Sequence, residues 1–316
     1  GVTMNSWHSY PSIFNLVHKA IAELLLDQVL VEEKIDGSQF SFGWFHEAEE
    51  SYPDGLLCRS KGAPVHTLAP DSMFKRAVDI VKELRHSDRL RPGWTYRAEY
   101  LAKPKHNVLA YDRIPACHLM IFDINTGQEE YLDYDRKADE AARLGFEVVP
   151  RLFQGMLVDI EALRALLETV SALGGQKVEG VVIKNYERFG LDKKVLMGKF
   201  VSEKFKEIHA KEWRGVNPNQ GDIVQALIAA YRTPARWQKA VQHLVEAGEL
   251  EQSPRDIGKL IAEVPADVEK ECAEEIREAL WKWAWPKVRR GLNAGMPEWY
   301  KERLMEKQFT DPAAEP

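Results

Sequence analysis

The sequence has 316 residues, of which 45% are hydrophobic and 29% charged, and its formal net charge is −6 at pH 7. These proportions are typical of a soluble globular protein, and the length allows a large core together with a second domain. The acidic balance excludes a protein that binds nucleic acid through overall positive charge, so any nucleic-acid surface must be a local basic one.

Neither the beginning of the sequence nor its cysteines indicate secretion. The segment GVTMNSWHSYPS lacks the basic and apolar stretches of a signal peptide, and no apolar run approaches the roughly 20 residues of a membrane span. The cysteines Cys58, Cys117 and Cys272 are odd in number and far apart. We therefore expect a cytoplasmic protein, monomeric and without membrane contacts, disulfides or a structural zinc site.

Up to about residue 210 the pattern mixes strands with helices. Phe40, Phe42 and Trp44 alternate with polar or small residues as in a half-buried strand, and the apolar run at 119–124 suits a buried strand. Strands mixed with helices predict an α+β fold. Helical spacing is seen after a predicted cap at Asp71, with Phe74, Ala77, Val78, Val81 and Leu84, and within 156–173, with Ile160, Leu163, Leu167 and Val170 before the stop Gly174–Gly175.

The composition changes after Gly215. Helical runs rich in Ala, Leu, Glu, Lys and Trp replace the alternating pattern, and residues 215–222, GVNPNQGD, have the composition of a linker. We predict a first domain over residues 1–214 and an all-helical domain over 215–316. Trp281 and Trp285 fall on one helical face, and we interpret them as packing inside the helical domain, with stacking against bases as the alternative.

Lys34 is the first candidate for chemistry. In the segment VLVEEKIDGSQFSF it ends a predicted strand and precedes the turn Asp36–Gly37, which can lift its side chain out of the sheet. A lysine becomes a nucleophile when desolvation or nearby positive charge removes its proton. A Lys-x-Asp-Gly match is frequent by chance, however, and a surface lysine at a hairpin turn is the alternative interpretation.

Further segments decide between these two interpretations. KIDG at 34–37 is followed in order by RSKG at 59–62, YRAEYL at 96–101, FDI at 122–124, EGVVIK at 179–184 and MGKFVSEKFKE at 197–207. This ordered set resembles the motifs of the covalent nucleotidyltransferase superfamily, which comprises DNA ligases, RNA ligases and mRNA capping enzymes. It is most similar to the phage-type, ATP-dependent RNA ligases, whose loop after the third motif also resembles residues 101–115. The resemblance implies a nucleotidyltransferase domain of antiparallel sheets with helices, similar to the ATP-grasp fold, followed by a small helical domain.

The resemblance also implies the catalytic residues Lys34, Glu99, Glu179 and Lys199. In this family the residue at Lys34 attacks ATP and becomes joined to AMP, while the residues at Glu99 and Glu179 hold the ribose and a divalent cation. Hard carboxylate oxygens suit Mg²⁺ or Mn²⁺, and Mg²⁺ takes only one or two carboxylates and keeps several waters. A cation at Lys199 would contact the α-phosphate, stabilise the transition state and lower the pKa of Lys34.

Four more residues are implied as nucleotide contacts. Asp36 and Gly37 follow Lys34 in the motif KIDG. The planar guanidinium group of Arg59 suits phosphate oxygens. The ring of Phe122 occupies the position that stacks on adenine in the family, and Asp123 beside it would be a further acidic site residue. Without the resemblance, Phe122 would be interpreted as a core residue.

One position departs from the family pattern. Many relatives have a second lysine two residues after the first cation of the last motif, but this chain has Val201 there. Lys184 and Lys204 are the candidates for the missing positive charge.

We predict an ATP-dependent RNA ligase that joins 3′-hydroxyl and 5′-phosphate RNA ends, in single strands or at a nick in a duplex. A minimal ATP-dependent DNA ligase is the first alternative, although such enzymes normally add a β-rich OB domain where this chain is helical. The second is a non-catalytic RNA-end-binding module derived from a ligase, which Val201 favours and the retained Lys34, Asp36, Glu99 and Glu179 disfavour.

Overall fold

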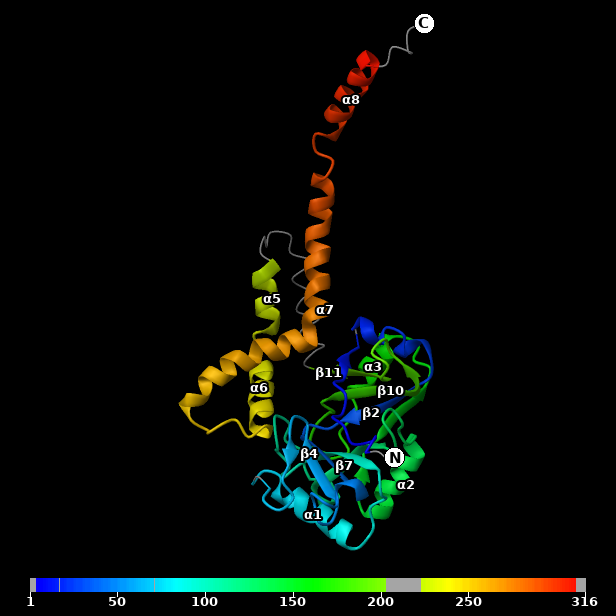
Figure 1. The fold of residues 1–316 in the computed structure, drawn as a ribbon, viewed down its shortest axis with the longest axis vertical. Coiled ribbons are helices and arrows are strands. Elements are labelled where there is room, and N and C mark those ends of the chain that lie inside the picture. Colours follow the sequence, from blue (N-terminus) through cyan, green and yellow to red (C-terminus); the bar gives the residue numbers. More distant parts are fainter. Residues whose placement is uncertain (1–3, 17, 71, 203–222, 311–316) are drawn as a thin grey trace.

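The computed structural model describes residues 4–16, 18–70, 72–202 and 223–310. Two β-sheets with helices form one body, and helices alone follow, which confirms the predicted α+β class (Figure 1). The strands are β1 (Phe14–Asn15), β2 (Val29–Lys34), β3 (Ser38–Trp44), β4 (Leu56–Ser60), β5 (Pro64–Val65), β6 (Thr95–Tyr100), β7 (Leu119–Asn125), β8 (Glu147–Val148), β9 (Arg151–Gly155), β10 (Gly180–Phe189) and β11 (Val195–Val201). The α-helices are α1 (Lys75–His86), α2 (Tyr134–Leu144), α3 (Ile160–Leu166), α5 (Ile223–Tyr231), α6 (Pro234–Glu246), α7 (Ile257–Gly291) and α8 (Met296–Thr310). Short 3-10 helices are η1 (Lys19–Ile21), η2 (Leu24–Leu26), η3 (His46–Ala48), η4 (Ala116–His118) and η5 (Pro254–Asp256).

The chain passes from one sheet to the other directly after Lys34. One sheet has five strands in the order β1-β11-β10-β2-β9, and the other has six in the order β5-β4-β3-β6-β7-β8. Strand β2 belongs to the first and β3 to the second, so residues 35–37 connect the two. Neighbouring strands run antiparallel except at β1–β11 and β7–β8.

Each sheet buries its own apolar layer. The six-stranded sheet packs against α1 and α2 through residues such as Phe42, Val78 and Leu144, whereas the five-stranded sheet packs against α3 through residues such as Val31 and Leu163. Burial of these side chains supplies the main driving force for folding each half. The turn after Lys34 is therefore held between two independently packed layers.

The predicted elements are confirmed at β3, β7 and α1, but one predicted helix is too long. Asp71, the expected cap of α1, lies outside the described residues. The segment 156–173 forms a helix only over α3, which begins after Asp159, whose side chain accepts a hydrogen bond from the backbone N–H of Ala162. Val170 instead forms a local β-bridge with Lys177, beyond the end of α3 at Leu166.

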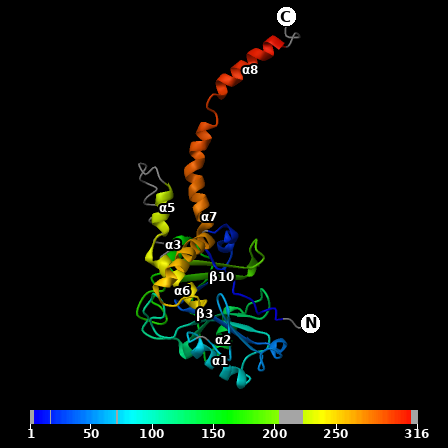
Figure 2. The same cartoon turned by 60° about the vertical axis from the view of Figure 1, so that its left-hand side comes forward.

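The last third of the described chain is helical, as predicted, although the linker at 215–222 lies outside the described residues. Helix α7 contains Pro265 and Pro286 and changes direction along its length, and its later part leads with α8 away from the sheets (Figures 1 and 2). The interpretation of Trp281 and Trp285 as packed core residues is wrong. Their rings stack on each other at 5.0 Å, and Trp281 is 62% exposed.

A buried ionic cluster ties α2 to both sheets. The ammonium group of Lys137 lies 2.5 Å from the carboxylate of Glu32, and that of Lys184 lies 2.6 Å from Glu32 and 3.1 Å from Asp123. All four side chains are almost completely buried. Burial would raise the pKa of Asp123, but the two lysines and the hydroxyls of Tyr10 and Tyr186 lower it. The four charges therefore depend on one another.

We expect Lys137→Met to lower the free energy of unfolding by about 3–5 kcal/mol, because it leaves Glu32 and Asp123 with only one buried cation. Urea unfolding at pH 7 measures the loss. The matched control is Lys75→Met, which breaks an exposed pair with Asp79 and should change the value by less than about 1 kcal/mol. Equal effects of the two substitutions would contradict a structural role for the cluster.

Within the residues that the structure describes, no helix combines the length and apolar character needed to cross a membrane.

Candidate active site

Strand pairing fixes the backbone on both sides of Lys34. Lys34 is the last residue of β2, and its register partner is Gly180, the first residue of β10. Glu179 directly precedes Gly180, so the two strands bring a lysine and a carboxylate to the same sheet end. The Nζ atom of Lys34 lies 3.3 Å from Oε2 of Glu179. Two residues that are 145 positions apart in the sequence thus meet at one end of the sheet.

Lys34 is a charged ammonium group in this state. Burial alone would lower its pKa, but the carboxylates of Glu179, Glu99 and Asp36 outweigh burial and raise the pKa above its ordinary value. The side chains of Lys34 and Glu179 are 31% and 28% exposed, so both remain accessible to a ligand. Positive charge brought close to these carboxylates would lower the pKa of the amine.

Glu99 faces the same turn from the other sheet. It lies on β6, and its Oε1 accepts a hydrogen bond of 3.1 Å from the backbone N–H of Gly37. Burial raises the pKa of Glu99 to about 8, with Glu246 and Glu179 adding to the rise and Lys34 opposing it. This carboxyl group therefore keeps its proton to a higher pH than a free glutamate does.

The loop 101–115 holds the turn after Lys34 in place. The Oδ2 atom of Asp36 accepts hydrogen bonds of 2.9 and 2.8 Å from the backbone N–H groups of 108 and 109. Asn107 donates to the carbonyl of Gly37 at 2.8 Å, and the hydroxyl of Tyr111 accepts from the N–H of Asp36 at 2.9 Å. Asp36 is only 7% exposed, and its hydrogen bonds fix the turn that follows Lys34. Direct contact of Asp36 with a nucleotide stays a prediction.

Two neighbours of Asp36 explain why the turn has this sequence. A Cβ atom on Gly37 would lie 2.7 Å from the carbonyl oxygen of Tyr100 and 2.8 Å from Cγ of Glu99, so only glycine allows this approach. Ser38 is fully buried, and its hydroxyl lies 2.8 Å from Nε2 of His106. The Nδ1 atom of His106 accepts from the N–H of Ala102, so Nε2 carries the proton and donates to Ser38.

Lys199 lies in the strand next to β10. Its register partners are Val182 of β10 and Asn15 of β1, which places it two strands from β2. Its ammonium group pairs with the carboxylate of Glu271 in α7. Burial lowers the pKa of Lys199 to about 8; Lys239 and Lys34 add to the fall, and Glu271 opposes it. The charge of Lys34 thus contributes to the lowered pKa of Lys199.

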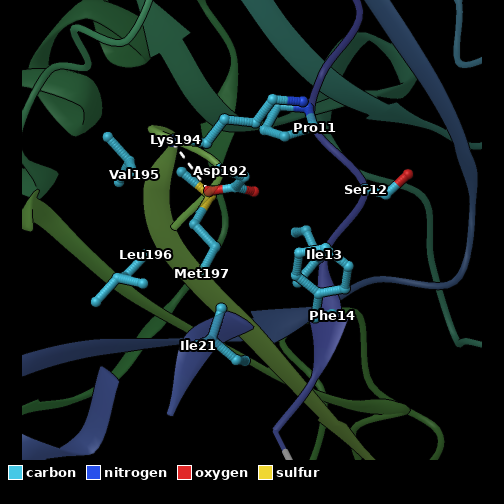
Figure 3. Close-up of a pocket in the computed structure, with 10 residues that line it drawn as sticks. All are labelled: Pro11, Ser12, Ile13, Phe14, Ile21, Asp192, Lys194, Val195, Leu196 and Met197. Atoms are coloured by element: carbon cyan, nitrogen blue, oxygen red, sulfur yellow. Dashed lines mark hydrogen bonds between the residues drawn. The ribbon is translucent and has the colours of Figure 1, made fainter. Parts of the chain in front are cut away.

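The other two predicted nucleotide contacts, Arg59 and Phe122, lie against the N-terminal segment. Arg59 donates to the hydroxyl of Ser9 at 2.6 Å, and the ring of Phe122 packs edge-on against Tyr10 at 5.0 Å. This segment continues along β11, where Figure 3 shows Ile13 and Phe14 across a small cavity of about 10 Å³ from Leu196 and Met197. A cavity of that volume holds no more than a water molecule. The segment therefore acts as a packed support, and the contacts of Arg59 and Phe122 with a nucleotide stay predictions.

Asp123 and Lys184 belong to the buried cluster instead of the site around Lys34. Asp123 is completely buried and accepts hydrogen bonds from Tyr10 and Tyr186. Lys184 is 2% exposed and donates to the carbonyl of Phe122. The buried pairing of Lys184 argues against it as the missing cation, and Asp123 as a further acidic site residue stays a prediction. Lys204, the other candidate, lies outside the described residues.

The helical region reaches this site through contacts that no sequence pattern indicates. Gln242 of α6 donates to the carbonyl of Gly37 at 2.9 Å. Glu271 of α7 pairs with Lys199 and also with Lys239 and Arg236 of α6. The sequence signal for these contacts was limited to charged residues on helices, which is also typical of solvated surfaces.

Together these elements place an amine and two carboxylates at the junction of two sheets, with a second amine close by. Among the described residues, no group of three or more His, Cys, Asp or Glu side chains is arranged to hold a metal ion. Glu99 and Glu179 offer hard oxygen atoms, and such a pair suits a cation that keeps most of its waters. The arrangement can support nucleophilic attack by an amine on a phosphorus atom.

Comparisons with known proteins give one family. The family model described as RNA ligase matches residues 27–201. A solved structure of Naegleria gruberi RNA ligase with PPi is 19% identical with a TM-score of 0.43, and the match covers 66% of this chain and 63% of that one. A variant of that ligase with ATP and Mn is also 19% identical with a TM-score of 0.43, over 64% of this chain and 58% of that one. The chain thus spans about three fifths of these solved relatives. A search among curated proteins found no match.

Proposed function

Because the chain belongs to the RNA ligase family, we propose that it is an ATP-dependent RNA ligase that joins 3′-hydroxyl and 5′-phosphate RNA ends through AMP bound to Lys34. The observation that carries this proposal is the meeting of Lys34 with Glu179 at 3.3 Å, with Glu99 hydrogen-bonded to the same turn. Lys34 ends β2, Glu99 lies in β6 and Glu179 directly precedes β10, so the folded sheets bring the three together.

The reaction takes place in three phosphoryl-transfer steps. The neutral amine of Lys34 attacks the α-phosphorus of ATP, a P–N bond forms, and the bond to the departing pyrophosphate breaks. An oxygen of the RNA 5′-phosphate then attacks the same phosphorus, breaks the P–N bond and leaves AMP joined to the RNA end. Finally the 3′-hydroxyl attacks the 5′-phosphorus, a phosphodiester forms, and AMP departs. Positioning and charge neutralisation supply most of the catalysis.

The charges around Lys34 explain why the amine reacts only with its substrate bound. In the free protein burial favours the neutral form of Lys34, but the neighbouring carboxylates, with Glu179 contributing most, keep the amine protonated. A cation that neutralised Glu179 would remove the largest influence that raises the pKa of Lys34, so burial, which lowers that pKa, would weigh more. Lys199 would then stabilise the negative charge on the α-phosphate in the transition state.

The carboxylates of Glu99 and Glu179 fit a divalent cation such as Mg²⁺ or Mn²⁺. Glu99 is held by one backbone hydrogen bond and has a raised pKa, which is the state expected of a ligand that lacks a strong cationic partner. A bound cation would neutralise the carboxylates and the phosphates and would orient the leaving group.

A proton on Glu99 competes with the cation. We therefore expect the affinity of the free protein for Mn²⁺ to increase by about tenfold for each unit by which the pH is raised, up to pH 8. Burial raises the pKa of Glu99 to about 8, so its carboxyl group is protonated below that pH and ionised above it. Electron paramagnetic resonance between pH 6.5 and 8.5 measures free Mn²⁺. Glu99→Gln should bind more weakly and lose this dependence, and an unchanged slope in that variant would place the proton on another group.

We assign the chemistry to residues 1–214 and contact with the RNA strand mainly to residues 215–316. Helix α7 carries Lys282, Lys287 and Arg289–Arg290 beside the exposed, stacked Trp281 and Trp285. Aromatic rings that stack on bases and cations that pair with phosphates are the two elements of single-strand binding. This local basic surface fits a chain whose overall charge is negative.

The end specificity can be tested with nicked duplexes that differ only in the sugar at each side of the nick. We expect faster sealing when the nucleotide that carries the 3′-hydroxyl is a ribonucleotide. Its 2′-hydroxyl lies next to the attacking 3′-hydroxyl and distinguishes RNA from DNA. The sugar on the 5′-phosphate side should matter less, since activation there occurs at a phosphate that both share. Four duplexes and single-stranded RNA, compared by initial sealing rate, complete the set.

Equal rates with ribose and deoxyribose at the 3′ end would contradict RNA specificity and favour a minimal DNA ligase. Binding of RNA ends without any sealing or any AMP adduct would favour a non-catalytic module.

A further inference from the structure

Two lysines from different parts of the fold share one carboxylate oxygen. The ammonium groups of Lys199 in β11 and Lys239 in α6 both donate to Oε1 of Glu271 in α7. The other oxygen of Glu271 accepts from Arg236 at 2.5 Å. Figures 1 and 2 show α6 and the first part of α7 beside the sheets, and Gln242 links α6 to the turn after Lys34. Lys239 is therefore a component of the site although it lies in the helical region.

The charges of this cluster favour an anion with more negative charge than one carboxylate. Arg236 has a second partner, Asp267, at 3.7 Å. Lys199 and Lys239, by contrast, share the single negative charge of Glu271. Burial would raise the pKa of Glu271, but the three cations hold it well below its usual range. A phosphate group offers several oxygens and more charge to the same ammonium groups.

From this arrangement we propose that Lys239 is the second phosphate-binding cation of the site, paired with Lys199, and that Glu271 occupies the place of a phosphate in the free protein. The ligand is the pyrophosphate portion of a nucleoside triphosphate. This inference rests on the proposed function. It also gives a physical role to the departure at Val201, because the helical region supplies the charge that the last motif lacks.

Pyrophosphate binding tests the inference without catalysis. In calorimetry with inorganic pyrophosphate, Lys239→Ala should bind roughly 10- to 100-fold more weakly than the wild-type protein, which corresponds to the loss of one charge-assisted hydrogen bond. Lys239→Arg should retain most of the affinity. Lys259→Ala removes the same charge from an exposed position of α7 and should change affinity by less than about threefold. Glu271→Gln should bind more tightly, because the competing carboxylate is gone.

Two rate measurements distinguish the source of the phosphate. If the site holds the leaving pyrophosphate, Lys239→Ala raises the ATP concentration needed for half-maximal formation of the AMP adduct and leaves transfer of AMP to 5′-phosphorylated RNA unchanged. The reverse pattern would assign the site to the RNA phosphate and overturn the inference. Wild-type pyrophosphate affinity in both Lys239→Ala and Lys239→Gln, with unchanged melting temperatures, would overturn it as well. If the wild-type protein formed no AMP adduct on Lys34 but its pyrophosphate binding still depended on Lys239, the proposed function would be refuted and the phosphate site at Lys239 would stand.

Discussion

Replacing Lys34 by alanine is expected to abolish sealing with ATP while preserving sealing of RNA that already carries AMP on its 5′-phosphate. The first step needs the amine as nucleophile, whereas the last step needs only the two RNA ends and the surrounding charges. Lys34→Arg should behave in the same way, because a guanidinium group keeps its proton and cannot attack phosphorus. Parallel assays with ATP plus 5′-phosphorylated RNA and with pre-adenylylated RNA separate the steps.

The matched control for Lys34 is Lys75→Ala, which removes an exposed lysine paired with Asp79 on α1. It should seal both substrates at the wild-type rate. Sealing with ATP by Lys34→Ala would place the nucleophile elsewhere. Loss of both activities in a folded Lys34→Ala protein would show that the lysine acts mainly by binding.

The second large effect is expected at Lys199. Lys199→Ala should slow formation of the AMP adduct by roughly 10²- to 10³-fold at saturating ATP, the usual cost of removing one group that stabilises transition-state charge. Lys199→Arg should recover part of the rate, because it restores the positive charge with a different geometry. Rapid-quench measurements of a single turnover give the rate directly.

Lys194→Ala is the control for Lys199, since Lys194 is exposed just before β11 begins. It should leave the rate unchanged. A loss below about threefold in Lys199→Ala would contradict its assignment to the α-phosphate, because a transition-state contact of this kind is worth more.

The position of Lys34 at a strand end could be predicted because short-range patterns encode it. An apolar strand followed by Asp36 and Gly37 predicts a lysine at a strand end, and the structure has β2 ending at Lys34. Glu99 and Glu179 were assigned to the site by the order of the motifs. Nothing local in the sequence indicates that Glu179 lies next to Lys34. The register between β2 and β10 supplies that information.

Long-range contacts explain what sequence reasoning missed. Asp36 is held by backbone groups more than 70 residues away, and this pairing depends on how the loop 101–115 folds over the turn. Lys184 is the last residue of the motif EGVVIK, but it pairs with Glu32 and Asp123 and so belongs to the buried cluster. Lys239 is one of many helical charges until α6 docks beside the site. In each case the partner was outside the range of any periodic pattern.

The mass of the intact protein after incubation with ATP and Mg²⁺ tests the central claim most directly. We predict the gain of one adenylyl group, located by peptide sequencing in the mass spectrometer on Lys34. Addition of RNA with a 5′-phosphate and a 3′-hydroxyl should remove this group and yield sealed RNA. A protein that seals RNA without passing through this adduct, or that carries AMP on a different residue, would contradict the account.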